Sequence, residues 1–406
     1  MTGSDRSTPF PLRRALVVAV ALAIAALTIS VAARVGTLLP GGAAAATTSP
    51  PPNVTGTTPA TPGPSATVTE PPPTDAPPTA IPTPALLPAP LTGLPVTPEA
   101  AGHHAIAVMI DDHALARPQS GFNAASVVWH APAEGGIPRY MLIFQDTIPA
   151  EVGPVRSARQ YYVEWAAEWN AMYVHSGGSP QAIQTLSAKG SGQWVYNADE
   201  FRWGGRYLWR VTDRIPPHTV YTDGEHLRRL AERLGARDEP MAPVWTFGPD
   251  IDPRLRPDGG TINVRYPYET ITYRYDAVTN TYPRYLNGSK KPQVDDADGQ
   301  VVAPKNVVII RMAFGALNDG HPNKHRLEAR DVGEGQAWVA TNGRTIKARW
   351  SKASRTAPTL LVDRDGNPIT LTAGQTFIQV IPTTYSYEIK DRTPPPFIVP
   401  MRVPSD

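Results

Sequence analysis

Short apolar runs separated by polar loops dominate the chain between residues 99 and 240. The runs at 104–110, 126–131, 139–145 and 171–175 are rich in β-branched and aromatic residues. Loops containing Pro, Gly, Asp and Asn bound the first three of them. This pattern predicts strands.

Helical signals lie between and after these runs. Aromatic residues recur at four-residue spacing over 161–169, which predicts a helix capped by Ser157. Ser179 suits the cap of a second helix that begins at Pro180, and residues 224–234 predict a third. Strand, helix, strand, Gly-rich turn and helix in this order favour a βαβ-like unit.

From about residue 241 the pattern changes to an alternation of period two, which is typical of half-buried strands. Turn signals such as Asn342-Gly343 separate several segments. We therefore predict an α+β protein in which an α/β-type domain (99–240) precedes a mostly antiparallel β domain (241–392). The strands predicted in the second domain are 261–266, 270–275, 281–286, 307–312, 337–341, 345–350, 359–362 and 377–381.

The N-terminus has the pattern of a membrane anchor. Three arginines within residues 1–14 precede an almost purely apolar run, Ala15–Ala33. At about 1.5 Å per residue this run can cross the hydrocarbon core of a bilayer. The charge asymmetry predicts a cytoplasmic segment (1–14), a single transmembrane helix or uncleaved signal anchor (15–37), and an extracytoplasmic remainder. A cleaved signal peptide is the alternative, because residues 41–46 are small.

Proline marks two further segments. Residues 40–97 are rich in Pro, Thr and Ala, a composition that cannot bury enough apolar area to offset the entropy of ordering. We predict a disordered or polyproline-like linker, which serves either as a spacer through a cell-wall layer or as a plain solubilising segment. Residues 393–406 are again proline-rich and predict a loose tail.

Composition excludes several classes of function. With 38 basic and 36 acidic residues, the net charge of +2 argues against a nucleic-acid partner bound through a basic surface. The absence of cysteine excludes disulfides, Cys-ligated zinc, thiol catalysis and lipidation of a cysteine. The predicted partners are the membrane, through the N-terminal helix, and a cell-wall polymer or envelope protein. Composition names no cofactor.

Polar residues gather just behind the predicted strand ends of the first domain. In an open α/β sheet such loops meet at one edge, where ligands bind. Arginine side chains and the backbone N–H groups at a helix entrance suit an anionic or sugar-containing ligand. The candidate ligand-binding residues are Arg117, Arg139, Arg156, Arg159, Gly177, Gly178, Ser179 and Trp203.

The same cluster permits a second hypothesis, a cation-dependent hydrolase of cell-wall or phosphoester substrates. Asp111 and Asp112, with Glu134, would hold the cation through carboxylate oxygens, and His175 would act as acid or base. Asp111, Glu134 and His175 are thus the catalytic candidates. Simpler interpretations remain open: the aspartates form a turn, Glu134 pairs with an arginine, and His175 is a structural hydrogen-bonding group. In a third hypothesis, arginine–carboxylate pairs only hold two domains together.

Several segments carry a family resemblance. They are PLTGLPV (90–96), AIAVMID (105–111), RPQSG (117–121), EGGIPRYMLIF (134–144), GPVRSAR (153–159), YVHSGGS (173–179) and KARWSK (347–352). Together they closely resemble the YerB-like family, which is built from paired N- and C-terminal DUF3048 domains. The resemblance covers residues 90–382. It implies a two-part extracytoplasmic bacterial envelope protein, and it carries over no reaction and no catalytic residue.

The chain departs from the family pattern at two places. Many relatives are lipoproteins, whereas this chain has no cysteine, so the helix at 15–37 is predicted to replace the lipid anchor. Gln293 stands two residues before Asp295, where the family pattern leads us to expect a histidine.

Overall fold

The structure is a computed structural model that describes residues 85–187 and 194–392. The predicted anchor at 15–37, the predicted linker as far as residue 84 and the predicted tail at 393–406 lie outside the described residues. Within the described part, no helix combines the length and the apolar character needed to cross a bilayer.

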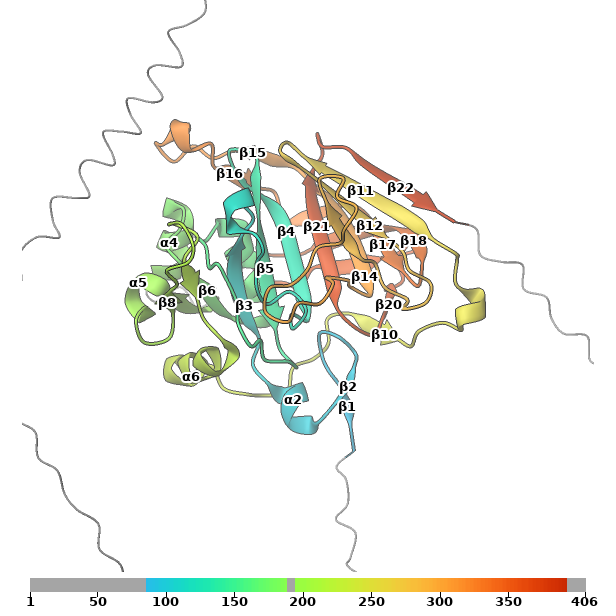
Figure 1. The fold of residues 1–406 in the computed structure, drawn as a ribbon, viewed down its shortest axis with the longest axis horizontal. Coiled ribbons are helices and arrows are strands. Elements are labelled where there is room, and N and C mark those ends of the chain that lie inside the picture. Colours follow the sequence, from blue (N-terminus) through green and yellow to red (C-terminus); the bar gives the residue numbers. More distant parts are fainter. Residues whose placement is uncertain (1–84, 188–193, 393–406) are drawn as a thin grey trace, which may run out of the picture. The chain divides into compact units, whose positions relative to one another are not determined.

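A mixed ten-stranded sheet runs through the centre of the fold (Figure 1). Its first five strands come from the C-terminal half and its last five from the N-terminal half. The halves meet where β21 pairs in parallel with β4, so both predicted domains contribute to one sheet. In spatial order the strands are β19 (Leu360–Val362), β18 (Arg344–Lys352), β17 (Gly333–Thr341), β14 (Asn306–Met312), β21 (Thr376–Pro382), β4 (Val127–Glu134), β5 (Ile137–Phe144), β3 (Ile106–Asp111), β6 (Met172–His175) and β7 (Tyr196–Asp199).

The central strands are buried on both faces, which explains their continuous apolar sequences. In β3, Val108 and Ile110 face one hydrophobic core, whereas Ala107 and Met109 face the other. The sheet is therefore the middle layer of three.

One face of this sheet is covered by α6 and by a four-stranded antiparallel sheet. Val264 and Ile271 of the smaller sheet lie in the same core as Ile309 of β14. The smaller sheet has the order β13 (Arg284–Leu286), β12 (Glu269–Arg274), β11 (Gly260–Tyr266) and β22 (Tyr387–Asp391), and α6 spans Gly224–Leu234.

The other face is covered by α3 (Gln160–Ala166), a following 3-10 turn and α4 (Pro180–Ser187). Trp165 of α3 stacks on Trp129 of β4 with ring centroids 4.5 Å apart. The prediction that Ser157 caps α3 is wrong. The neighbouring Ala158 forms a β-bridge with Gly178, so the chain stays extended there and the helix starts after Arg159.

The remaining described elements are short. They are β1 (Leu87–Pro88), β2 (Pro95–Val96), α2 (Pro98–Gly102), α5 (Glu200–Trp203), β8 (Trp209–Arg210), β9 (Val220–Tyr221), β10 (Thr246–Gly248), β15 (Phe314–Ala316), β16 (Leu327–Ala329), β20 (Thr370–Thr372) and the 3-10 turns Ala114–Ala116, Ala167–Trp169, Pro253–Leu255 and Pro322–Lys324.

The predicted linker is too long at its C-terminal end, because the fold includes residues 85–97. Strand β1 pairs with β2, and Leu91 in the connecting turn is fully buried. Thr92 Oγ1 donates to Asp146 Oδ2 at 3.0 Å. Prolines at the edges of these short strands gave this hairpin the composition of a linker.

The βαβ-like unit predicted from the strand at 139–145, the following helix and the strand at 171–175 is wrong, because β3 lies between β5 and β6 and pairs antiparallel with β5 but in parallel with β6. A βαβ unit forms instead from β6, α4 and β7, a strand that the sequence patterns missed. Ser179 caps α4, since its Oγ accepts from the N–H of Ala182 at 3.4 Å. The protein as a whole is mainly β with few helices.

Candidate functional site

The two adjacent aspartates at the end of β3 bind different partners. Asp111 Oδ2 lies 2.8 Å from Nε of Arg156 and 2.7 Å from Nδ1 of His218. The ring of His218 in turn stacks on that of His113, with centroids 5.1 Å apart. Asp111 therefore anchors a loop that the sequence places more than 100 residues away.

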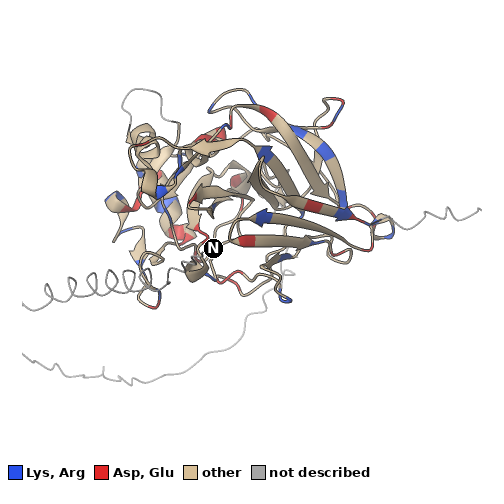
Figure 2. Ribbon diagram, turned by 90° about the horizontal axis from the view of Figure 1, so that it is seen from above, with Lys and Arg blue, Asp and Glu red and all other residues tan. Residues whose placement is uncertain are grey.

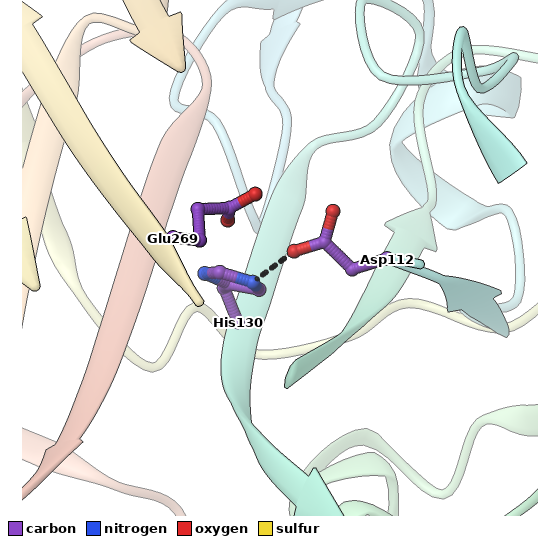
Figure 3. A group of neighbouring side chains, drawn as sticks. All are labelled: Asp112, His130 and Glu269. Atoms are coloured by element: carbon purple, nitrogen blue, oxygen red, sulfur yellow. Dashed lines mark hydrogen bonds and ion pairs between the residues drawn. The ribbon is translucent and has the colours of Figure 1, made fainter. Parts of the chain in front are cut away.

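Asp112 is the centre of a second ion network. Its Oδ1 accepts from Nη2 of Arg117 at 2.8 Å, and its Oδ2 lies 2.8 Å from Nε2 of His130 on β4. Arg117 also pairs with Glu269 at the start of β12. Asp112, His130 and Glu269 are all buried, and each offers a ligand atom within 4.8 Å of the others' (Figure 3).

This network extends between the two sheets. His130 Nδ1 lies 3.0 Å from Oε1 of Gln379 on β21, and Nε2 of that glutamine donates to the hydroxyl of Tyr273 at 2.8 Å. Arg284 of the smaller sheet is fully buried and donates to the hydroxyl of Tyr140 at 2.6 Å. Its Nη2 lies 3.9 Å from Oε1 of Glu269, so each carboxylate of the network has a guanidinium nearby.

Burial and pairing set the charges of the network. Burial lowers the pKa of His130, which favours the neutral ring, although Asp112 opposes this effect. Burial alone would raise the pKa of Asp112. His130 and the two guanidiniums lower this pKa by more than burial raises it, so the net shift is downward. Two carboxylates balance two guanidiniums in this group of side chains, and both ring nitrogens of His130 face oxygen acceptors.

A cavity of about 370 Å³ opens beside the network, and we call it the Arg117 pocket. Its wall includes the ring of Tyr268, which is 74% exposed. Two buried polar atoms of lining residues, Arg117 Nε and Glu269 Oε1, have no hydrogen-bond partner in the described part of the chain. The lining residues are Asp112, His113, Ala114, Arg117, Gly135, Ile137, Pro138, Tyr268, Glu269 and Asn287.

Glu134 lies in a different ion cluster. Its carboxylate pairs with Arg139 at 2.8 Å and with Arg159 at 2.5 Å, and Arg326 lies 3.8 Å away. Burial raises the pKa of Glu134, but the charges of Arg139 and Arg159 outweigh it and lower the pKa. Glu134 is thus held by arginines and does not join Asp111 and Asp112 in the cation site predicted for all three.

All four predicted ligand-binding arginines have a carboxylate partner. Arg117 pairs with Asp112 and Glu269, Arg156 with Asp111, and Arg139 and Arg159 with Glu134. Basic and acidic residues are accordingly interspersed over the fold (Figure 2). Only Arg117 of the four lines the Arg117 pocket.

The predicted helix entrance lies elsewhere, and its donors are largely used internally. The N–H of Gly177 donates to Asp199 at 3.2 Å, and that of Ser179 to the carbonyl of Ala158 at 3.1 Å. His175 is fully buried, with Nδ1 2.8 Å from the carbonyl of Gly177 and Nε2 2.8 Å from Oδ1 of Asn197. This geometry favours a structural, hydrogen-bonding role for His175 over a role as acid or base.

Two other predicted features have structural surroundings. Gly178 packs against Ala158 and Ile183, where a Cβ would lie 3.0–3.1 Å from their side chains. Trp203 on α5 packs edge-on against Tyr207, and the guanidinium of Arg202 lies 5.0 Å from its ring centroid. At the position of the expected histidine, Gln293 Oε1 accepts from Arg284.

Sequence patterns missed His130, Glu269, Arg284 and Tyr268. His130 gave a signal, because a histidine inside the apolar run 126–131 requires a buried polar partner. Glu269 and Arg284 sit in ordinary strand sequences. Their importance depends on contacts 152 and 144 residues away along the chain.

The opposite face of the large sheet carries a second acidic group. Asp331 is 4% exposed, and the carboxyl group of Glu164 on α3 is near enough to influence its charge. Burial and the adjacent charge of Glu164 raise the pKa of Asp331 to about 8, although Lys352 opposes the shift. Like charges on neighbouring buried carboxyl groups repel, which favours the protonated form of one of them.

The first prediction concerns stability against pH. Because the folded-state pKa of Asp331 lies above its ordinary value of 3.8, its stabilising contribution is present at low pH and is lost as the pH rises from about 4 to about 8. Asp331→Asn should remove this loss of stability. The loss is at most about 1.4 kcal/mol in the free energy of unfolding for each pH unit. Urea unfolding at pH 5 and pH 8, with EDTA present to remove metal ions, measures the free energy of unfolding of both proteins. The difference between variant and wild type should favour the variant more at pH 8 than at pH 5. Equal differences at both pH values would contradict the assignment.

Fold and site define a three-layer, mainly β protein whose two sequence halves complete one sheet and one buried ion network. The family models described as the N-terminal and C-terminal domains of a protein of unknown function (DUF3048) match residues 91–237 and 262–378. The chain belongs to this DUF3048 family, and the predicted resemblance is confirmed.

A sequence comparison and a structure comparison extend this finding. The chain is 31% identical over 303 residues to "Putative lipoprotein YerB" of Bacillus subtilis (strain 168). The matched region spans 73% of this chain and 86% of the relative. The crystal structure of the YerB protein from Bacillus subtilis matches with a TM-score of 0.65 at 26% identity, over 74% of this chain and 99% of that one.

Proposed function

We propose that this chain is an extracytoplasmic envelope protein that binds a sugar-containing ligand, such as a cell-wall polymer, in the Arg117 pocket. The lipoprotein name of the Bacillus relative and the predicted helix at 15–37 both support an envelope location. The two unpartnered atoms, Arg117 Nε and Glu269 Oε1, carry the binding argument.

A hydroxyl group is the complement of that pair of atoms. It can donate to Glu269 Oε1 or accept from Arg117 Nε once a shift of the lining side chains opens these buried atoms to the pocket. The carboxylates of the network disfavour an anion, because a phosphate or carboxylate would lie beside Asp112 and Glu269. A neutral polyhydroxyl ligand meets no such repulsion, and the exposed ring of Tyr268 gives it an apolar surface.

A cation-dependent hydrolase is the second candidate, and one observation favours it. Asp112, His130 and Glu269 have the donor atoms that a divalent metal takes, within 4.8 Å of one another. However, Arg117 already bridges Asp112 and Glu269, so it supplies the positive charge that a metal would bring. Metal binding would require Arg117 to leave, and saccharide binding would not.

The second prediction tests the pocket. Tyr268→Ala should weaken binding of the purified full-length protein to a neutral chito-oligosaccharide about tenfold, because the sugar loses its aromatic surface, which corresponds to about 1.4 kcal/mol. Isothermal titration calorimetry measures the affinity. The melting temperature should hardly change, because the side chain is exposed.

Phe201→Ala is a matched control, since Phe201 is 76% exposed and its ring lies over Gly177 at the predicted helix entrance. It should leave the affinity unchanged. The opposite pattern, with loss in Phe201→Ala alone, would move the site to the helix entrance. No binding by the wild type, or preferential binding of poly(glycerol phosphate), would contradict the proposal of a neutral sugar.

A further inference from the structure

A second cavity lies on the opposite face of the large sheet from the Arg117 pocket. Its volume is about 590 Å³, and α3, the segment 328–332 and the residues after β18 enclose it. Glu164 and Asp331 both line this cavity, and neither takes part in the proposed sugar site.

Asp331 has an unusual environment for a carboxylate. It is 4% exposed, and its Oδ2 receives no hydrogen bond from an N–H or O–H group of the described residues. The carboxyl group of Glu164, which is 3% exposed and accepts from Nε2 of Gln160 at 2.7 Å, lines the same cavity. Two adjacent buried carboxyl groups need a positive charge between them, either a shared proton or a bound cation.

We propose that Glu164 and Asp331 form a divalent-cation site at the base of this cavity. Hard cations such as Ca²⁺ take carboxylate and hydroxyl oxygens and complete their coordination with water. The hydroxyl of Ser354 and the amide of Gln160 also line the cavity, which has room for water.

The surrounding positive charges leave this site available. Lys352 is neutralised by Glu168, with Nζ 2.8 Å from Oε1. Arg355 Nε lies 3.8 Å from Oε1 of Glu164, but its side chain is 62% exposed and can turn into solvent when a cation arrives.

Terbium luminescence tests the site directly, because Tb³⁺ binds Ca²⁺ sites and is sensitised by nearby aromatic rings. Tyr161 lines the cavity, and its ring centroid lies 5.3 Å from that of Trp165. With excitation at the aromatic band, the full-length protein should give saturable emission that Ca²⁺ displaces. Glu164→Gln and Asp331→Asn should each weaken Tb³⁺ binding at least tenfold.

Asp365→Asn serves as the control, since its side chain is 65% exposed in a distant turn, and it should bind Tb³⁺ like the wild type. Circular dichroism checks that each isosteric variant is folded. Absence of saturable emission from the wild type, or emission that persists in both Glu164→Gln and Asp331→Asn, would overturn the proposal.

Discussion

Replacement of Lys352 by methionine is expected to lower the free energy of unfolding by about 3–5 kcal/mol. Lys352 and Glu168 form an ion pair in which both side chains are fully buried. Lys352 also donates to the carbonyl of Ala357 at 2.5 Å. Burial already raises the pKa of Glu168, and without the lysine this carboxyl has no cation to compensate its burial. Urea unfolding at pH 7 measures the loss.

The control is Lys347→Met, which changes an exposed lysine on the same strand, β18. It should alter the free energy of unfolding by less than about 0.5 kcal/mol. Adding Glu168→Gln to Lys352→Met should recover part of the loss, because the unpaired charge disappears. A loss below about 1 kcal/mol for Lys352→Met would show that the pair is not a buried link between the 3-10 turn after α3 and the large sheet.

Arg284→Met is expected to have a similar effect, about 3–5 kcal/mol, because it removes one of two guanidiniums from the network of Asp112 and Glu269. Arg284 donates to Tyr140 and Gln293, and its guanidinium lies 5.2 Å and 6.0 Å from the ring centroids of Tyr140 and Tyr273. Its loss leaves two buried carboxylates with Arg117 alone. Urea unfolding again measures the change.

The pH dependence of the destabilisation by Arg284→Met follows from Asp112, whose pKa is lowered in the fold, partly by Arg284. The stabilising contribution of the Asp112 carboxylate is present above the ordinary pKa of 3.8 and is lost as the pH falls below that value. Arg284→Met should therefore lower the free energy of unfolding, relative to the wild type, more at pH 7 than at pH 3. Arg274→Met is the control, because Arg274 is exposed on the neighbouring strand β12. Equal free energies of unfolding for Arg284→Met and Arg274→Met would contradict the role of Arg284 in the ion network.

Local patterns predicted the strands of the large sheet well, because burial on both faces leaves a continuous apolar sequence such as Ile106–Asp111. The helices at α4 and α6 were also predictable, since their caps are local: Ser179 for one, and Gly235 with a positive φ of +82° for the other. The parallel pairing of β21 with β4 was not, because about 245 residues separate the two strands and no local pattern encodes their register.

The same limit explains the site. The sequence indicated that Asp112 and Arg117 carry chemistry, and the structure places both at the Arg117 pocket. It could not indicate that Glu269 is the third member, since an acidic residue at the start of a strand, after Pro267-Tyr268, is ordinary. Nor could it show that Arg139, Arg156 and Arg159 are used internally, because pairing depends on the tertiary fold.

The Arg117 pocket is proposed to bind a neutral sugar. A crystal structure of the full-length protein soaked with a chito-oligosaccharide tests it most directly. We expect a sugar ring against Tyr268, with one hydroxyl between Arg117 Nε and Glu269 Oε1. Sugar density at another surface, or a pocket that stays empty at a concentration that saturates binding in solution, would contradict the claim.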